Sequence, residues 1–304
     1  MGEIKPYKSD DGDVYLWTYL PSFAAGSIFA ALFMIATIIV KVRLIKTRTR
    51  FSIPFALGGV AEHIGYGARA YCAKHTDKLG PFAIQSILIL VAPAFYAASI
   101  YMVLSRLMMS VGAERFSIIP VRWLTKIFVV GDILSFLVQS AGGSMMTMHN
   151  IKPSLAKTVV IIGLFIQVGV FSIFIVTAIT FHVRMRRWPL AQSLDGTSTW
   201  RTTMGMMYAT CFLIMLRSSF RIVEFMLGQD GYLMHHEWPL YAFDGALMFT
   251  VMVIYGVWYP GNLKKKPTSV EMQGFLGGYN EVGRKEQQWP SHEREFAPNH
   301  HPIH

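Results

Sequence analysis

The chain alternates between long apolar stretches and shorter polar connections. A helix that crosses the hydrocarbon core of a bilayer needs about 20 mostly apolar residues. Stretches of this length occupy residues 19–40, 52–72, 82–104, 123–143, 158–181, 203–226 and 239–259. The pattern therefore predicts an all-α integral membrane protein, built as a bundle of seven transmembrane helices.

The two flanking segments lack this apolar pattern. Residues 1–18 are polar and acidic, and residues 261–304 are rich in Gly, Pro, Gln, Glu and His. A segment of the second kind buries too little apolar surface to offset the entropy lost on ordering. We therefore expect three parts: an extracellular N-terminal segment (1–18), a seven-helix transmembrane domain (19–260) and a disordered cytosolic tail (261–304).

The distribution of charge predicts the orientation of the bundle. Nineteen of the 28 Lys and Arg residues lie in the tail and in the connections that follow the first, third and fifth stretches. Only six lie in the N-terminal segment and the alternate connections. Because basic residues accumulate on the cytosolic side, we expect the N-terminus outside and the C-terminus in the cytosol.

Overall composition agrees with a membrane protein. Hydrophobic residues make up 53% of the chain and charged residues 15%, which would give a soluble enzyme of 304 residues an unusually apolar surface. The net charge of +10 follows the predicted topology. The charge therefore gives no reason to expect a nucleic-acid partner.

Two neighbouring stretches carry a stripe of polar residues with the same spacing, i, i+4 and i+7. This spacing places three side chains on one face of a helix. The stripes consist of Arg217, Arg221 and Glu224, and of Glu237, Tyr241 and Asp244. Ionisable groups at membrane depth are costly unless they face the bundle interior, a wet cavity or each other. The stripes therefore indicate a functional site inside the bundle.

Further polar residues interrupt the second to fifth stretches. They are Glu62, Arg69, Gln85, Asp132, Gln139 and Gln167. Glu62 and Arg69 share a face but lie about 10 Å apart along the helix axis, which is too far for a direct ion pair. Asp132 is a candidate for function because a central carboxylate is costly. The alternative for Asp132 is an ion pair with an arginine of the second or sixth stretch.

The direction of each stretch sorts the candidate residues by depth. The outer half of the bundle should contain Arg69, Gln85, Gln139, Arg221, Glu224 and Asp244. The middle should contain Glu62, Asp132, Gln167 and Arg217. We therefore predict a polar cavity that opens outward, with Tyr241 on its wall. The alternative is an ion-pair lattice that only holds the helices in register.

Other chemistries lack the residues they need. The histidines of the outer connections, His75, His149, His235 and His236, show no metal-ligand spacing. The last stretch contains no lysine for a retinal Schiff base, and no Walker-type phosphate loop is present. We therefore expect no metal, no cofactor and no enzymatic activity. Topology alone still leaves a divergent seven-helix receptor open.

The polar motifs, taken in order, resemble those of a known family. They are Glu62-x-x-Gly65-Tyr66-x-x-Arg69, Gln85 leading to Ala92-Pro93, Tyr101-x-x-x-x-Arg106, Asp132-x-x-Ser135-x-x-x-Gln139-x-x-Gly142-Gly143, Gly163-Leu164-x-x-Gln167, Arg217-x-x-x-Arg221-x-x-Glu224, and Gly228-x-x-Gly231 followed by Glu237, Tyr241 and Asp244. Over about residues 15–260 the chain is similar to the fungal lipid-translocating exporter family, the RTA-like aminocholesterol-resistance proteins.

The resemblance implies a fungal seven-span protein of the plasma membrane. Such a protein would export lipid-like amphiphiles, among them sphingoid long-chain bases and sterol-like toxic compounds, and would confer resistance to them. Its partners would be membrane lipids or amphiphilic small molecules. The sequence defines no oligomeric state. The resemblance is also compatible with a second function, that of a lipid sensor or receptor-like regulator whose cytosolic loops and tail relay the state of the cavity.

Overall fold

The structure is a computed structural model that describes residues 7–9, 12–14, 21–111, 117, 119–145, 153–187, 199–227 and 237–261. All of them belong to one compact unit that ends at Lys264. The predicted tail, apart from Gly261, lies outside the described residues, as does most of the predicted N-terminal segment. Gly228, Gly231, His149, His235 and His236 also lie outside them.

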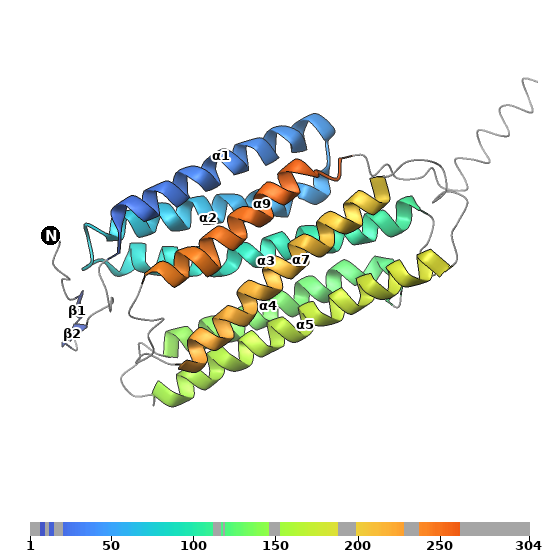
Figure 1. The fold of residues 1–304 in the computed structure, drawn as a ribbon. Coiled ribbons are helices and arrows are strands. Elements are labelled where there is room, and N and C mark those ends of the chain that lie inside the picture. The colour runs from blue at the N-terminus through green and yellow to red at the C-terminus, as the bar shows by residue number, and fades with distance from the viewer. Residues whose placement is uncertain are drawn as a thin grey trace, which may run out of the picture. The chain divides into compact units, whose positions relative to one another are not determined.

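Seven helical segments make up most of the described part of the chain (Figure 1). They are α1 (Phe23–Thr47), α2 (Ile53–Cys72), α3 (Leu79–Ser110), α4 (Val121–Met145), α5 (Pro153–Arg187), α7 (Thr199–Leu227), and a last segment in which the π-helix η3 (Leu240–Ala246) continues into α9 (Leu247–Val257). Each segment corresponds to one predicted apolar stretch. The 3-10 turn η1 (Arg50–Ser52) precedes α2.

A short hairpin lies near the N-terminus, within the segment that the sequence predicts to precede the helices. The strands β1 (Tyr7–Ser9) and β2 (Gly12–Val14) pair antiparallel, with Tyr7 opposite Val14. The sequence-based prediction named no strand in residues 1–18. A hairpin of three residues per strand gives too short an alternating pattern to be detected against its polar surroundings.

Four of the described helices are long and apolar enough to cross a membrane. They are α1, α3, α5 and the joined segment of η3 and α9. The other three helices, α2, α4 and α7, carry most of the ionisable residues of the predicted site, which lower their mean hydropathy. On α1 and α5 large apolar side chains such as Ile28, Ile45 and Phe165 are more than half exposed. This apolar outer surface suits contact with lipid.

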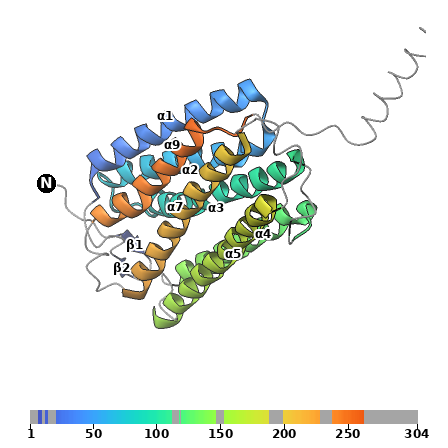
Figure 2. The same cartoon turned by 45° about the vertical axis from the view of Figure 1, so that its right-hand side comes forward.

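The helices form a closed ring in which each one packs against the next along the chain. α1 contacts α2, α2 contacts α3, and so on through α4, α5, α7 and α9, and α9 returns to α1. α3 also contacts α7 and so divides the ring. Figures 1 and 2 show the result, with α1, α2 and α9 on one side of α3 and α7, and α4 and α5 on the other. We call the side with α1, α2 and α9 the first lobe and the side with α4 and α5 the second lobe. α3 and α7 lie between the two lobes.

Small residues allow the helices of each lobe to approach closely. In the first lobe, a Cβ atom added at Gly58 of α2 would lie 2.7 Å from the ring of Tyr96 and 3.0 Å from the carbonyl oxygen of Ala92, both on α3. In the second lobe, a Cβ atom at Gly163 of α5 would lie 3.0 Å from backbone atoms of α4. Glycine at such positions brings backbones together, as is common between membrane helices.

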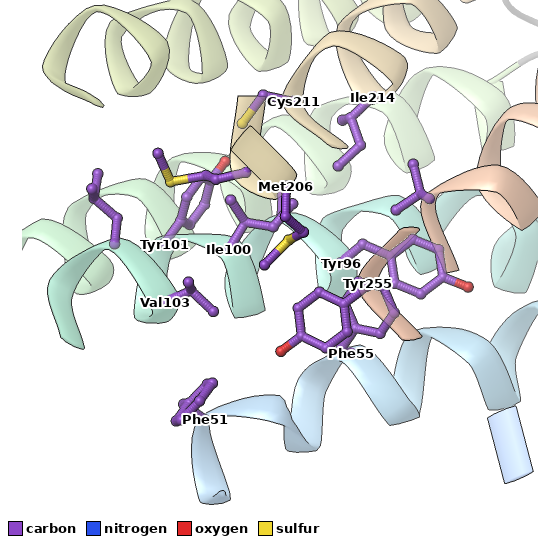
Figure 3. Packing of buried hydrophobic residues seen from close by; sticks show 14 of the residues in the cluster. Phe51, Phe55, Tyr96, Ile100, Tyr101, Val103, Met206, Cys211, Ile214 and Tyr255 are labelled. Carbon is purple, nitrogen blue, oxygen red and sulfur yellow. The ribbon is translucent and has the colours of Figure 1, made fainter. Parts of the chain in front are cut away.

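Aromatic side chains fill the interior of the first lobe. The ring of Phe55 lies between those of Tyr96 and Tyr255, with centroid distances of 4.6 and 3.8 Å (Figure 3). These residues come from α2, α3 and α9, so one stack joins three helices. Cys72 and Cys211 are both buried and free.

Candidate functional site

A buried network of ion pairs joins α7 to the π-helix η3. Arg217 Nε donates to Asp244 Oδ1, and Arg221 Nη2 lies 3.5 Å from Asp244 Oδ2. Arg221 Nη1 also donates to Glu224 Oε2 at 2.9 Å. Arg217 and Asp244 are each 2% exposed. We call these four residues the inner network. Its two arginines and two carboxylates balance in formal charge.

Local sequence explains how α7 and η3 present these groups. The i, i+4 and i+7 spacing of the arginines and Glu224 places all three on the face of α7 that turns toward η3. A second partner of Arg217 comes from α3, because Arg217 Nη2 donates to the carbonyl oxygen of Ile89 at 3.1 Å. A π-helical segment is rare and often occurs at functional sites. Here the π-helix carries both Tyr241 and Asp244.

A second ion pair joins α2 to Glu237, which precedes η3. Arg69 Nη2 donates to Glu237 Oε1 at 2.9 Å, and Arg69 Nε donates to the hydroxyl of Tyr241 at 3.1 Å. The Tyr241 hydroxyl in turn donates to Glu237 at 2.9 Å. The backbone N–H of Ser22, which caps α1, donates to both carboxylate oxygens of Glu237 at 3.1 and 2.9 Å. We call Arg69, Glu237 and Tyr241 the clamp, because they tie α1, α2 and η3 together.

Glu62 lies on the same face of α2 as Arg69, about two turns further along the helix toward η1. It is 1% exposed, and neither of its carboxylate oxygens has a hydrogen-bond partner among the described residues. The hydroxyls of Tyr66 and Tyr96 are likewise buried and unpartnered there, as is Oε1 of Gln85. We predicted that Glu62 and Arg69 form no direct ion pair. The structure agrees, because Arg69 pairs with Glu237.

The polar residues of the second lobe form their own contacts. The hydroxyl of Tyr101 on α3 donates to Asp132 Oδ2 on α4 at 2.9 Å. Gln139 Nε2 on α4 donates to Gln167 Oε1 on α5 at 2.8 Å. The alternative that Asp132 pairs with an arginine of the sixth helix was wrong, because Arg217 and Arg221 bind Asp244 and Glu224 instead.

The structure thus places the predicted residues in two separate groups, whereas the sequence analysis assigned them to a single polar cavity. The first lobe holds Glu62, Arg69, Gln85, Arg217, Arg221, Glu224, Tyr241 and Asp244, and the second lobe holds Asp132, Gln139 and Gln167. All are buried except Gln167, Arg221 and Tyr241, which are partly exposed. The division arises because α3 and α7 touch across the ring. A contact of this kind between helices distant in sequence has no signature in the spacing of polar residues.

A surface groove lies on another face of α2. It has a volume of about 400 Å³ and an almost wholly apolar lining. The lining residues are His63, Ile64, Gly67, Ala68, Tyr71, Pro81 and Ile84, from α2 and α3. None of the predicted site residues lines this groove, since Glu62 and Gln85 face the interior of the lobe.

The prediction of the site left out residues that the structure places within it. Glu237 belonged to the predicted stripe but not to the predicted cavity, and it is the acceptor that holds the clamp together. Tyr66, Tyr96 and Tyr101 contribute hydroxyls to the two groups. Tyr66 and Tyr101 both stand in the motifs quoted above, and Tyr66 also lies four residues after Glu62 on the same helical face. Tyr96 had no such signal.

Apolar helices around a buried set of ionisable groups define an integral membrane protein. The chain belongs to the family described as RTA1 like protein, which matches residues 55–267. The family resemblance predicted from the motifs is therefore confirmed.

Relatives in Saccharomyces cerevisiae support the assignment. Protein RTA1 is 34% identical over an alignment of 270 residues, with 81% of this chain and 84% of the relative covered. Protoporphyrin uptake protein 1 is 33% identical over 285 residues, with 81% and 92% covered. Sphingoid long-chain base transporter RSB1 of the strain Lalvin EC1118 is 28% identical over 269 residues, with 75% and 69% covered. No solved structure matches the chain.

Proposed function

We propose that this protein is a seven-span translocator of the plasma membrane that exports lipid-like amphiphiles, such as sphingoid long-chain bases and sterol-like toxic compounds, and so confers resistance. Its N-terminus would lie outside and its C-terminus in the cytosol. The observation that carries the proposal is the group of ionisable residues buried in the first lobe. Such residues within a membrane are costly, and they commonly mark substrate or ion pathways.

The names of two relatives indicate the kind of cargo. One is called a sphingoid long-chain base transporter and the other a protoporphyrin uptake protein. A sphingoid base joins an amine to a long alkyl chain, whereas a protoporphyrin joins carboxylates to an apolar ring system. The first lobe contains both carboxylates and arginines, which are the groups that bind an amine and a carboxylate respectively.

The clamp has the position of an outer gate in the proposed orientation. Arg69 lies toward the outer end of α2, and Glu62 lies about 10 Å deeper along the helix. Glu237 holds the N-terminus of α1, the end of α2 and the start of η3 through the contacts described above. Release of Glu237 would free these three elements and open the lobe outward. The cargo undergoes no covalent change in this mechanism, so the proposed protein is not an enzyme.

Flux measurements test the proposal directly. Purified protein is reconstituted into liposomes that contain a fluorescent sphingoid base, and transfer of the base between leaflets is followed by quenching. We expect transfer that depends on the protein and falls at least about tenfold in Glu224→Gln, which removes one carboxylate of the inner network. The matched control is Asp77→Asn, the same kind of change at an exposed carboxylate between α2 and α3. Wild-type liposomes without transfer would overturn the proposal.

The sensor hypothesis predicts a different result in the same experiments. A sensor would require residues 262–304 for resistance in cells and would give no transfer in liposomes. A translocator would retain transfer without those residues.

The proposed orientation is tested by labelling of added cysteines. Cys72 and Cys211 are 0% and 3% exposed, so background labelling should be low. Asp77→Cys should react with an impermeant maleimide on intact cells, and Arg48→Cys only after permeabilisation. The opposite pattern would reverse the orientation.

A further inference from the structure

Glu62 differs from the other carboxylates of the two groups in the described part of the chain. Asp244 and Glu224 are paired with arginines, and Glu237 is paired with Arg69. Asp132 accepts a hydrogen bond from Tyr101. Both oxygens of Glu62 lack a partner among the described residues, although the side chain is 1% exposed.

The charges around Glu62 do not compensate it. The charged groups that act on it are Arg217 and Arg221 of α7 and Asp244 of η3. They belong to the inner network, in which Glu224 completes the balance of two positive and two negative charges. An ionised carboxylate at this position would therefore be a surplus charge in a medium of low dielectric constant, which is strongly unfavourable without a partner.

The other elements near Glu62 contribute hydroxyls and aromatic rings. Tyr66 lies four residues after Glu62 on the same face of α2, and the ring of Tyr96 on α3 packs against Gly58, four residues before Glu62. Both hydroxyls are buried without a partner among the described residues. From α1, the rings of Phe29 and Phe33 stack on Tyr66 at 5.4 and 5.5 Å. No described charge from α1 acts on Glu62. Glu62 therefore lies among hydroxyl groups and aromatic rings.

This combination matches the donors of a primary ammonium group. A primary ammonium has three N–H donors and no acceptor. The Glu62 carboxylate and the oxygens of Tyr66 and Tyr96 are three acceptor groups left without partners among the described residues. Gly245 of η3 leaves room for the Tyr66 hydroxyl, because a Cβ atom at position 245 would lie 2.7 Å from the hydroxyl oxygen.

We propose that Glu62 is a proton-exchange site, at which the ammonium group of a long-chain amine replaces the proton of the carboxyl group. The inference rests on the proposed function and adds to it the residue and the coupling ion. At rest Glu62 is protonated and neutral. When the ammonium binds, the carboxyl O–H bond breaks, the proton leaves to the aqueous phase, and the carboxylate pairs with the ammonium. Charge in the lobe is unchanged, and amine and proton move in opposite directions.

Proton release on binding tests this inference. Purified full-length protein in detergent micelles is mixed with dodecylamine in weakly buffered solution near pH 6.5, where the amine itself is fully protonated. We expect about one proton released per amine bound. The apparent Kd for the amine should rise as the pH falls, by up to about tenfold per pH unit. Dodecyltrimethylammonium, which has no N–H donor, should bind more weakly.

Three variants separate Glu62 from the other carboxylates. Glu62→Gln should bind the amine more weakly, release no proton and show a Kd that is independent of pH. Glu62→Asp keeps the carboxyl group and should keep proton release. Asp77→Asn, the control outside the membrane-spanning helices, should behave as wild type. Thermal unfolding of each variant shows whether it is folded, and Glu62→Gln should be about as stable as wild type because the amide and the protonated carboxyl group are both neutral.

The outcomes distinguish this inference from the proposed function. Amine binding without proton release, or proton release that persists in Glu62→Gln, would overturn the role of Glu62 and leave translocation standing. Proton release lost in Asp132→Asn but retained in Glu62→Gln would move the exchange site to the second lobe and also overturn the inference. Absence of both amine binding and liposome transfer would overturn the proposed function together with it.

Discussion

Asp244 is the carboxylate shared by two arginines, and its replacement tests whether the inner network stabilises the fold. Asp244→Leu leaves Arg217, which is 2% exposed, with the carbonyl oxygen of Ile89 at 3.1 Å as an acceptor but without a countercharge. Removing one partner of a buried ion pair costs about 3–5 kcal/mol. At about 2–4 °C per kcal/mol for a chain of this size, the unfolding temperature should fall by about 6–20 °C.

A double-mutant cycle turns this expectation into a measurement of the pair. Arg217→Met should cost less than Asp244→Leu, because Arg221 Nη2 remains 3.5 Å from the carboxylate of Asp244. The double variant removes both charges and leaves the neutral pair of Arg221 and Glu224, so it should be clearly more stable than Asp244→Leu alone.

The assay is thermal unfolding of the purified protein in detergent, followed by intrinsic tryptophan fluorescence. Wild type and the three variants are measured at equal protein and detergent concentration. A decrease below about 2 °C for Asp244→Leu would refute the reasoning, and so would a double variant whose loss equals the sum of the two single losses.

Three further predictions concern the clamp, the second lobe and helix packing. Glu237→Gln should loosen the start of α1, and the backbone amides after Ser22 should exchange hydrogen faster. The free energy of unfolding should fall by about 1–3 kcal/mol because charged hydrogen bonds are replaced by neutral ones. Unchanged exchange of these amides would contradict the role of the clamp. Tyr101→Phe should cost about 1–3 kcal/mol by leaving Asp132 without its donor, and most of this loss should disappear when Asp132→Leu is added; equal losses with and without that second change would contradict the pairing. Gly163→Val places side-chain atoms against the backbone of α4, because a Cβ atom alone would already lie 3.0 Å from it. The free energy of unfolding should fall by about 1–3 kcal/mol. Gly169→Val should have less effect, because no atom lies within 4 Å of the added Cβ.

The apolar pattern of the chain was enough to predict the helices, because the length of an apolar stretch is set by the thickness of the bilayer. All seven predicted stretches correspond to helical segments. Their ends were less well predicted, since α1 continues through Lys41, Arg43 and Lys46 to Thr47. A charged residue marks where the apolar layer ends, whereas backbone hydrogen bonds allow the helix to continue into water.

The stripe on α7 was also fixed by the sequence. The spacing of Arg217, Arg221 and Glu224 follows from 3.6 residues per turn, and the high cost of ionisable groups in lipid requires the stripe to face inward. The same argument predicted that Asp132 and Glu62 would be buried, and both are.

Only the tertiary structure decided which charges meet. The two arginines of α7 pair with Asp244 and Glu224 rather than with Asp132, and Glu237 takes Arg69. The reason is the contact between α3 and α7, which places Asp132 in one lobe and Asp244 in the other. Spacing along a helix gives the face on which a charge lies but not the helix opposite that face. For the same reason the sequence could not show which of the four carboxylates Glu62, Asp132, Glu224 and Asp244 would lack a partner. The packing shows that, among these four, it is Glu62 that has no hydrogen-bond partner among the described residues.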